Sequence, residues 1–547
     1  MNTARINRLT LLGVALLFCA FQIQNVNSIN ILGLYTSHSP SHLIVHMSVA
    51  KALAEKGHNV TVVSSLEPKV THKNINHIVI PAPKEGMEAL DKMMSEIAKK
   101  KNSIFSTVRD LLGSMSIMLE LQFDAMKDKR FTALYENPDN KFDVVILGFF
   151  MNDFQLGVAA RFKAPIIVEW TAASNDLIDR YVGNPPEISY VSSMSATTTP
   201  GVPMTFLQRL KNVFERIFFR GVELIINNLM RRYYRDLYPR ENFPTYDEMK
   251  KNVSMIFTNS HFSEGLIRPN VPAVVEMGGI QIKDKPDPLP KDIDDLMNAS
   301  KENGAILFSL GSNLKSDFIN PNTNKIIYNV LSKLKQNVIW KWEDLDNTPG
   351  KASNIIYKKW LPQDDILAHP NLKLFITHAG KGGIAEAQYH GVPMVALPCF
   401  ADQSKNAEYM EQSGYGVQLD MLSLTEEALT KALQEVLSNP IYKKNINKFS
   451  ELYRDRPMSA KQSVVYWTEY VARHHGAVHM QSPLVHLNTI QYLALDVFAV
   501  IFIALYIVWR IIKLGFCFIC KKACNALQCK KKDEAKNKNK NKKVKKQ

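Results

Sequence analysis

Residues 360–403 read WLPQDDILAHPNLKLFITHAGKGGIAEAQYHGVPMVALPCFADQ. Within this stretch the apolar run 372–377 is short and bounded by polar residues, as a buried parallel strand is. It leads directly into the turn HAGKGG at 378–383 and then into a helix-like segment. Glycines let a backbone approach an anion closely, and the first amides of a helix have no partner inside it, so both suit phosphate oxygens. The stretch therefore predicts a nucleotide-diphosphate site at the edge of a parallel α/β sheet.

Polar and aromatic side chains surround this turn. His378 offers a charge-assisted donor at the same place. A second strand, 392–397, is followed by Asp402 and Gln403, which suit hydroxyl recognition at the carboxyl edge of the sheet, where ligands of α/β proteins bind. Trp360 offers a flat apolar face for a base.

These residues at this spacing resemble the signature of the UDP-glycosyltransferase family. The resemblance covers nearly the whole chain and is strongest to the membrane-anchored animal members, above all the insect UDP-glucosyltransferases, with the UDP-glucuronosyltransferases beside them. It implies an α/β fold of two facing Rossmann-like domains, the GT-B glycosyltransferase architecture, with a C-terminal transmembrane helix. Two positions depart from the family pattern: Ala379 replaces the usual first glycine, and Gly382 stands where mammalian members often carry a polar residue. Both could reshape the choice of donor.

The resemblance also implies a UDP-sugar site. In chain order its residues are Ser309 and Ser312 (diphosphate), Trp360 (uracil), Gln363 (base and ribose), His378, Gly380 and Gly383 (diphosphate), Glu386 (ribose hydroxyls), and Asp402 and Gln403 (donor sugar). The sequence holds no acidic cluster suited to a divalent ion on the diphosphate. We therefore expect no metal requirement and no permanently bound cofactor, with a UDP-sugar, UDP-glucose first, as co-substrate.

The chain opens with a predicted βαβ unit. A strand-like run at 29–35 and a helical pattern at 43–56 are followed by a second strand at 60–64. Histidine at the carboxyl edge of a first strand suits general-base work near neutral pH. In the family a Ser-His pair at the start of this helix carries the base, and it falls on Ser41 and His42; His38 and His46 are rivals by proximity.

Such a base usually has an orienting carboxylate, which stabilises the imidazolium. The strand 143–147 matches the family strand whose end commonly carries that acid, yet the matching position is Gly148. Asp153 follows five residues later and could face the cleft from the start of the next helix. A dyad of His42 and Asp153 is one hypothesis; a helix-start carboxylate stabilised by the helix dipole is the other.

Length and charge limit the remaining classes. At 547 residues the chain exceeds one ordinary core and suits two domains. Of the net charge of +15, residues 521–547 supply +10, and the body of the chain is close to neutral. The charge belongs to the tail, so a nucleic-acid partner is not expected.

Both ends carry targeting signals. Arg5 and Arg8 precede the apolar run 9–20, which together describe a secretory signal peptide. The predominantly apolar run 492–512, as a helix, spans about 31 Å, enough to cross a membrane once. The lysine-rich tail that follows would stay cytosolic, and its last residues resemble a lysine-based retrieval signal. We expect a single-pass type I protein of the endoplasmic reticulum membrane, with its catalytic part lumenal.

Cysteines agree with this topology. Only Cys399 falls in the predicted lumenal body, so no disulfide can form there. Four others follow the predicted span, and palmitoylation and metal binding are both open for them; they are Cys517, Cys520, Cys524 and Cys529.

The predicted organisation follows from these features. It comprises a signal peptide (1–28), an acceptor-binding Rossmann-like domain (29–282), a linker (283–292), a UDP-sugar-binding Rossmann-like domain (293–475), a connection (476–491), a transmembrane helix (492–512) and a basic cytosolic tail (513–547).

The predicted function is inverting transfer of a hexose from a UDP-sugar to a hydroxyl of a small lipophilic acceptor, as in detoxification. Glucose is the first choice of donor sugar and glucuronate the second. A non-catalytic binding protein of the same fold is the alternative, which Gly148 supports. A nicotinamide-dependent oxidoreductase is remote because the turn 36–42 lacks the glycine fingerprint of dinucleotide sites. Homo-oligomerisation is left open.

Overall fold

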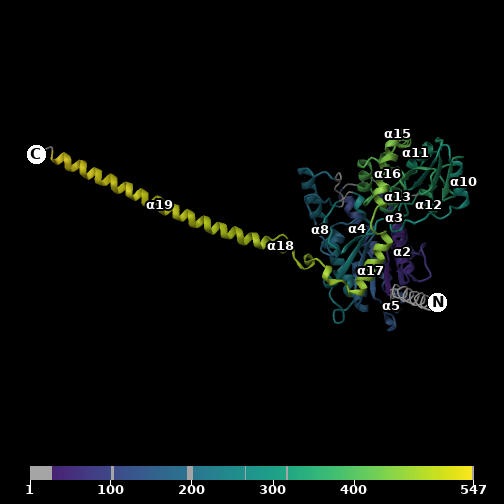
Figure 1. The fold of residues 1–547 in the computed structure, drawn as a ribbon, viewed down its shortest axis with the longest axis horizontal. Helices are drawn as coiled ribbons and strands as arrows, with labels where there is room; N and C mark the ends of the chain where they lie inside the picture. The colour runs from purple at the N-terminus through teal and green to yellow at the C-terminus, as the bar shows by residue number, and fades with distance from the viewer. Residues whose placement is uncertain (1–27, 100–103, 194–200, 265–266, 316–317, 545–547) are drawn as a thin grey trace, which may run out of the picture. The chain divides into compact units, whose positions relative to one another are not determined.

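The computed structural model describes residues 28–99, 104–193, 201–264, 267–315 and 318–544. The chain up to Val485 forms one compact unit, and His486 begins a second. The first unit contains two parallel β-sheets, each covered by helices on both faces (Figure 1). The predicted two-domain α/β fold is thus confirmed. The predicted signal peptide lies outside the described residues, except for Ser28.

The first sheet has seven strands in the order β3-β2-β1-β4-β5-β6-β7, all parallel to their neighbours. They are β1 (Asn30–Tyr35), β2 (Asn59–Ser64), β3 (Ile75–Val79), β4 (Val144–Gly148), β5 (Ile166–Trp170), β6 (Val253–Thr258) and β7 (Val274–Glu276). Successive side chains of a strand point to opposite faces, so Leu32 and Leu34 enter one core while Ile31 and Tyr35 enter the other. Sheets buried on both faces need such continuous apolar strands.

Helices from distant parts of the chain cover this sheet. On one face α2 (Pro40–Glu55) packs beside α17 (Ala460–Arg473), and their contact buries Leu53 and Val464 (Figure 1). The other face carries α4 (Ile104–Ala125), α5 (Lys129–Glu136), the 3-10 turn η1 (Asp153–Leu156), α6 (Gly157–Phe162), α7 (Asp176–Asp179), α8 (Phe206–Leu237) and α9 (Tyr246–Lys251). α3 (Lys84–Lys99) packs on α4.

The second sheet has six parallel strands in the order β10-β9-β8-β11-β12-β13. They are β8 (Ala305–Ser309), β9 (Asn337–Lys341), β10 (Ile355–Lys358), β11 (Leu372–Thr377), β12 (Met394–Ala396) and β13 (Gly416–Gln418). One face is covered by α10 (Lys291–Ala299), α12 (Gln363–Leu367), α13 (Lys381–His390), α14 (Gln403–Gln412) and α16 (Pro440–Arg454), and the other by α11 (Pro321–Leu331) and α15 (Glu426–Ser438).

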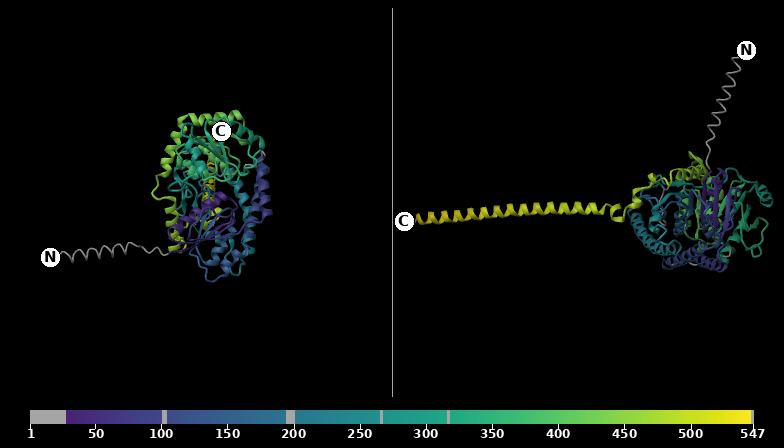
Figure 2. Two further views of the ribbon diagram at one scale, coloured as in Figure 1. Left: turned by 90° about the vertical axis from the view of Figure 1, so that its right-hand side faces the viewer. Right: turned by 90° about the horizontal axis from the view of Figure 1, so that it is seen from below.

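The chain returns to the first domain after α16. Residues 455–459 lead from α16, which packs on α13, to α17, which packs on α2, and Figure 2 shows this green to yellow-green path. A capping box of Ser459 and Gln462 starts α17. The structure thus lays residues 460–473, assigned to the second domain in the sequence analysis, on the first sheet. The boundary residues of the domains stay a prediction.

The second unit contains α18 (Thr489–Tyr492) and α19 (Leu495–Val544). Ala494 takes a left-handed φ of 50°, which separates the two helices, so the long helix begins three residues after the predicted start of the span. An 18-residue window of α19 has a mean hydropathy of 2.3, and none of it is buried. α19 is therefore a candidate membrane span by length and composition.

The contact of α17 with α2 predicts a measurable contribution to stability. Val464→Ala removes two fully buried methyl groups and should lower the free energy of unfolding by about 1–3 kcal/mol, because the cavity left behind collapses only in part. Thermal unfolding of the detergent-solubilised protein measures the change. Val478→Ala, at a side chain that is 72% exposed, is the matched control. Equal unfolding midpoints for the two variants would contradict the assigned packing.

Candidate active site

The predicted site residues lie on loops at the carboxyl ends of the strands of both sheets. The turn 36–39 after β1 meets the turn after β8. Ser39 Oγ donates to Asn313 Oδ1 at 3.0 Å, and the backbone N–H of Ser41 donates to Ser312 Oγ at 3.1 Å. The first turn of α2 therefore touches the loop that the sequence assigned to the diphosphate.

His42 lies in this first turn of α2. Its ring stands edge-on to Phe150 and His46, with centroids 5.2 and 6.5 Å away. Its Nδ1 is buried without a hydrogen-bond partner among the described residues. Burial, and secondly His46, lower the pKa of His42 to about 3. The imidazole is therefore neutral near pH 7, which is the form that accepts a proton.

Asp153 lies in a different polar cluster. Its carboxylate accepts hydrogen bonds from the hydroxyls of Tyr181, at 2.8 Å, and Tyr246, and Lys250 Nζ lies 3.2 Å away. Burial and the Asp153 charge raise the pKa of Tyr181 well above its ordinary value. No hydrogen bond or ion pair joins Asp153 to His42 within the described part of the chain. The structure does not bring the predicted dyad together.

His378 follows β11 and packs against two glycines. A Cβ at Gly311, which has a φ of 79°, would lie 2.5 Å from Cε1 of the imidazole, and a Cβ at Gly380 would also collide with the ring. Only glycine leaves room for the ring at these places. Burial, and secondly Lys341, lower the pKa of His378 to about 4, and its Nδ1 is buried without a partner among the described residues.

Ala379, one of the two departures noted above, has a left-handed φ of 63°. That conformation suits glycine best, since a Cβ adds a steric cost. Its N–H donates to Thr377 Oγ1 at 3.2 Å, and its carbonyl accepts from Asn406 Nδ2 at 3.0 Å. These two bonds hold the turn in place despite the alanine.

The helix α13 presents its amino end at this turn. Its N-cap is Gly380, which has no side chain to cap the first amides, so the N–H groups of 381–383 lack partners within the helix. The helix dipole makes this end favourable for an anion. Lys381 forms an ion pair with Glu264 of the first domain, and both side chains are buried. Its charge is thereby already compensated.

One turn further along α13, Glu386 forms the ribose-side part of the predicted site. Gln363 Nε2 donates to its carboxyl group at 2.7 Å, and Gln281 of the first domain lies 3.5 Å from it. Burial, and secondly the charge of Asp364, raise the pKa of Glu386 to about 8. The group is therefore protonated at pH 7 and can both donate and accept.

Trp360 is 40% exposed, and a lysine from the first domain covers its ring. Lys69 Nζ lies 3.0 Å from the ring centroid. Burial, and secondly Lys341, lower the pKa of Lys69. A base that stacks on Trp360 has to displace this ammonium group.

Asp402 and Gln403 have different hydrogen-bond partners. Asp402 accepts from Asn406 Nδ2 at 2.7 Å, and burial raises its pKa. Gln403 Oε1 accepts the backbone N–H groups of Cys399, at 2.8 Å, and Phe400, at 3.1 Å. Gln403 thus shapes the turn before α14, while the Asp402 carboxylate is bonded to Asn406 within that helix. Ser309 is buried and its Oγ accepts from the Gly311 N–H at 3.3 Å.

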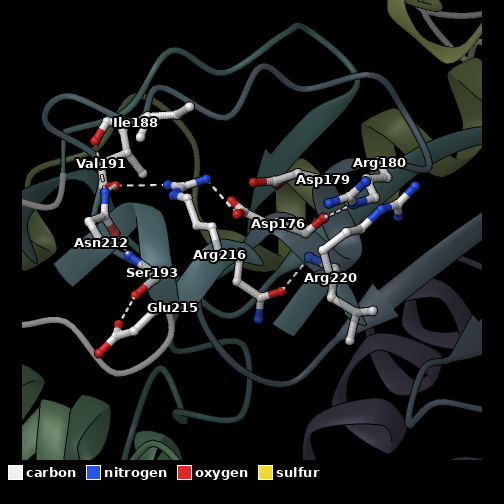
Figure 3. Close-up of polar contacts among 12 residues, drawn as sticks. Asp176, Asp179, Arg180, Ile188, Val191, Ser193, Asn212, Glu215, Arg216 and Arg220 are labelled. Carbon is white, nitrogen blue, oxygen red and sulfur yellow. Dashed lines mark hydrogen bonds and ion pairs between the residues drawn. The ribbon is translucent and has the colours of Figure 1, made fainter. Parts of the chain in front are cut away.

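A polar network in the first domain joins Asn212 of α8 to the segment 188–193 (Figure 3). Asn212 of α8 donates to the carbonyls of Ile188 and Val191, at 2.8 and 3.0 Å, and accepts from the Ser193 N–H at 2.7 Å. Lys405 of α14 then donates to the Ser193 carbonyl at 2.8 Å. Residues 188–193 of the first domain are therefore tied to the second domain through Ser193. Residues 194–200 lie outside the described residues.

Ser41, which precedes His42, is bonded to Ser312, and the neighbouring Gly311 packs against His378, which also packs against Gly380 at the amino end of α13. The structure also reveals interactions that the sequence analysis missed. One of them is a buried pair of His46 and Glu169. Nδ1 of His46 lies 2.9 Å from Oε1 of Glu169. Glu169 interrupts the apolar strand 166–170, and a charged residue inside a buried strand is the signal that could have identified it.

Comparison with known proteins identifies the class to which this fold and site belong. The sequence profile described as UDP-glucoronosyl and UDP-glucosyl transferase matches residues 33–532. UDP-glucosyltransferase 2 of Dactylopius coccus is 32% identical over 92% of this chain and 93% of its own length. UDP-glucuronosyltransferase 2B15 of Homo sapiens is 31% identical over 88% of this chain and 91% of its own.

Solved structures agree on the fold. A UDP-glucosyltransferase from Polygonum tinctorium, capable of glucosylating indoxyl, superposes with a TM-score of 0.54 at 14% identity, covering 82% of this chain and 99% of the other. The calicheamicin glycosyltransferase CalG4 gives a TM-score of 0.51 at 16% identity, covering 83% and 100%. The chain belongs to the UDP-glycosyltransferase family and is an enzyme that transfers a sugar from a UDP-sugar.

The raised pKa of Glu386 predicts a pH-dependent stability. The folded protein keeps this proton up to about pH 8, whereas the unfolded chain loses it near pH 4.5, so the stabilisation by this group declines as pH rises between these values. Glu386→Gln removes the titration at nearly constant shape. The unfolding midpoint of this variant, relative to the wild type, should therefore increase from pH 5 to pH 8. Thermal unfolding at both pH values, with the exposed Glu427→Gln as control, measures it; a difference that does not change with pH would contradict the buried carboxyl.

Proposed function

We propose that this enzyme transfers glucose, with inversion, from UDP-glucose to a hydroxyl of a small lipophilic acceptor, as in conjugation for detoxification. The observation that carries the proposal is the position of His42 in the first turn of α2, where burial lowers the pKa of the imidazole and keeps it neutral. The preceding residue, Ser41, is hydrogen-bonded to Ser312 of the diphosphate turn. A base for the acceptor thus stands beside the donor site. Glucose is preferred over glucuronate because the insect relative is named a glucosyltransferase.

In the proposed reaction His42 takes the proton of the acceptor hydroxyl. The oxygen then forms a bond to the anomeric carbon while the bond from that carbon to the UDP oxygen breaks. Attack from the side opposite to UDP inverts the configuration. The electron pair of the broken bond leaves with UDP, and the proton on His42 returns to solvent after the product departs. A positioned base of this kind contributes roughly 10²–10⁴-fold in rate.

Groups at the proposed diphosphate site stabilise the negative charge that develops on UDP. The free amides at the start of α13 and the dipole of that helix stabilise the diphosphate. His378 is neutral in the ligand-free enzyme because burial lowers its pKa to about 4. An adjacent diphosphate favours the protonated imidazole, so His378 becomes a charge-assisted donor when the ligand arrives. We assign the uracil to Trp360, the ribose to Glu386 with Gln363, and the sugar to Asp402.

A membrane location is part of the proposal. The candidate span in α19 and the lysine-rich sequence after it support a type I anchor in the endoplasmic reticulum membrane with a lumenal active site. An enzyme held at a bilayer meets acceptors that partition into lipid. No metal is needed by the proposed steps, because the amides and His378 supply the charge stabilisation.

His42→Gln tests the base directly. We expect acceptor-dependent UDP release to fall about 100-fold or more, since glutamine cannot take up the proton, while UDP affinity stays unchanged. Release from UDP-glucose and from UDP-glucuronate is measured with solubilised protein and a panel of phenols and alcohols. Wild-type protein that binds UDP tightly but releases none with any acceptor would instead indicate a binding protein.

Trp360→Ala tests the base-stacking face. We expect UDP binding to weaken by about 1–3 kcal/mol, the usual contribution of a base stacked on an aromatic ring. Lys69→Ala should leave UDP binding intact or tighten it, because the ring no longer has to be uncovered. Calorimetric titration with UDP measures both, with Trp509→Ala in α19 as the control. Unchanged affinity in Trp360→Ala would place the uracil elsewhere.

A further inference from the structure

The buried polar cluster behind His42 is unexplained by the proposed reaction. His46 lies one turn further along α2, and its side chain and that of Glu169 are both fully buried. Nδ1 of His46 lies 2.9 Å from Oε1 of Glu169, an ion-pair distance, and the Tyr35 hydroxyl is the other group that interacts with Glu169. Nε2 of His46 has no hydrogen-bond partner among the described residues. Buried polar atoms without partners are rare in folded proteins and call for an explanation such as a catalytic role. Nδ1 of His42 is unpartnered in the same way.

The end of β4 explains why this cluster can exist. A Cβ at Gly148 would lie 2.9 Å from Nε2 of His46 and 2.7 Å from Cδ1 of Tyr35. The rings of Tyr35 and His46 are stacked, with centroids 4.8 Å apart. A larger residue at 148 could not coexist with these two rings. The imidazole of His46 thus occupies the space where an acidic side chain from β4 would stand.

The neighbouring strand carries a buried carboxylate. Glu169 of β5 is the register partner of Gly148 of β4. Its negative charge adds to burial in raising the pKa of Tyr35 well above the ordinary value. His46 contacts Glu169 on one side and His42 on the other, so it lies between the carboxylate and the proposed base.

We propose that Glu169, acting through His46, is the carboxylate that orients His42 and stabilises its imidazolium, in place of an acid at position 148. This inference rests on the proposed function. Nδ1–H of His46 faces Glu169, and its Nε2 accepts Nδ1–H of His42, which leaves Nε2 of His42 to take the acceptor proton. The His42 and His46 ring centroids are 6.5 Å apart and Nδ1 of His42 has no partner among the described residues, so this hydrogen bond is absent from the structure and, in the proposal, forms when the acceptor binds. His46 and Glu169 are positioning residues.

The surroundings of His42 favour this arrangement. His38 is the other titratable group beside it in the turn, and burial lowers the pKa of His38 to about 4, so it carries no charge at pH 7. Phe150 covers another side of the ring. Asp153 is already engaged by two tyrosines and a lysine. Glu169 is therefore the acid best placed to compensate an imidazolium here.

Glu169→Gln is the first test, because it keeps the shape and removes the charge. We expect kcat to fall by about 100-fold at pH 7, with the KM for UDP-sugar unchanged and the acid limb of the kcat/KM profile shifted to lower pH. Glu55→Gln, an exposed carboxylate on α2, is the matched control. A Glu169→Gln variant with wild-type turnover and pH profile would overturn the inference. Wild-type protein without transfer would overturn the proposed function itself, and this inference with it.

A rescue experiment separates catalytic positioning from packing. In a His46→Ala/Glu169→Gln background both partners are removed together, so that no charge is left buried alone, and UDP binding and thermal unfolding confirm the fold. The space vacated by His46 lets the Tyr35 ring, which stacks on it, move away from position 148, and a side chain at 148 can then be admitted. Adding Gly148→Asp should raise kcat at least 10-fold above that of the double variant. It should also return the acid limb of the kcat/KM profile toward its wild-type position. Failure of the added carboxylate to restore turnover, in a protein that still binds UDP, would assign the pair a structural role.

Discussion

Parallel strands place all their carboxyl ends at one edge of a sheet, and the two sheets of this chain bring those edges into contact. Ser41 reaches Ser312, and Lys381 reaches Glu264, across the boundary between the domains. Everything that defines the site depends on this arrangement. Residues more than 300 positions apart in sequence, such as His42 and His378, converge because each follows a strand that ends at the shared edge.

Burial at this edge determines the charge state of the site before a ligand arrives. The pKa of His42 and that of His378 are lowered, and the pKa of Glu386 is raised, each chiefly by loss of solvent. All three groups are therefore neutral near pH 7. A site prepared in this way bears little charge of its own, so in the proposed reaction the charged interactions arise only with the diphosphate. Desolvation of neutral groups costs less than desolvation of ions, so the burial of these three side chains is tolerated.

Features that depend on local order could be predicted from the sequence. The strand, glycine turn and helix at 372–390 follow from apolar runs and glycine spacing, and the structure shows why Gly311 and Gly380 are needed around His378. Predictions that depended on three-dimensional direction were harder. Asp153 is near the end of β4 in sequence, yet η1 turns it toward Tyr181. Lys69 covers Trp360 from nearly 300 residues away, and no local pattern announces such a contact.

The position of Glu169 is another feature that could not be predicted from the sequence. Glu169 is the single acid in the apolar run IIVEW at 166–170, and this run alone does not indicate which residues it faces. Only the pairing of β4 with β5 shows that it stands beside Gly148. In the sequence, the absence of an acid at 148 and the presence of one at 169 look unrelated. The strand register shows that the two positions are neighbours.

The return of the chain to the first domain limits how the two domains can move. They are joined twice, by residues 277–290 and by residues 455–459. The two crossings are adjacent: Arg456 donates to the carbonyl of Gly278 at 3.0 Å, and Lys461 lies 3.0 Å from Asp284. Bodies joined by two neighbouring links can rotate about the line through them but cannot slide apart. Any relative motion of the two domains is therefore expected to be a rotation about that line rather than a translation.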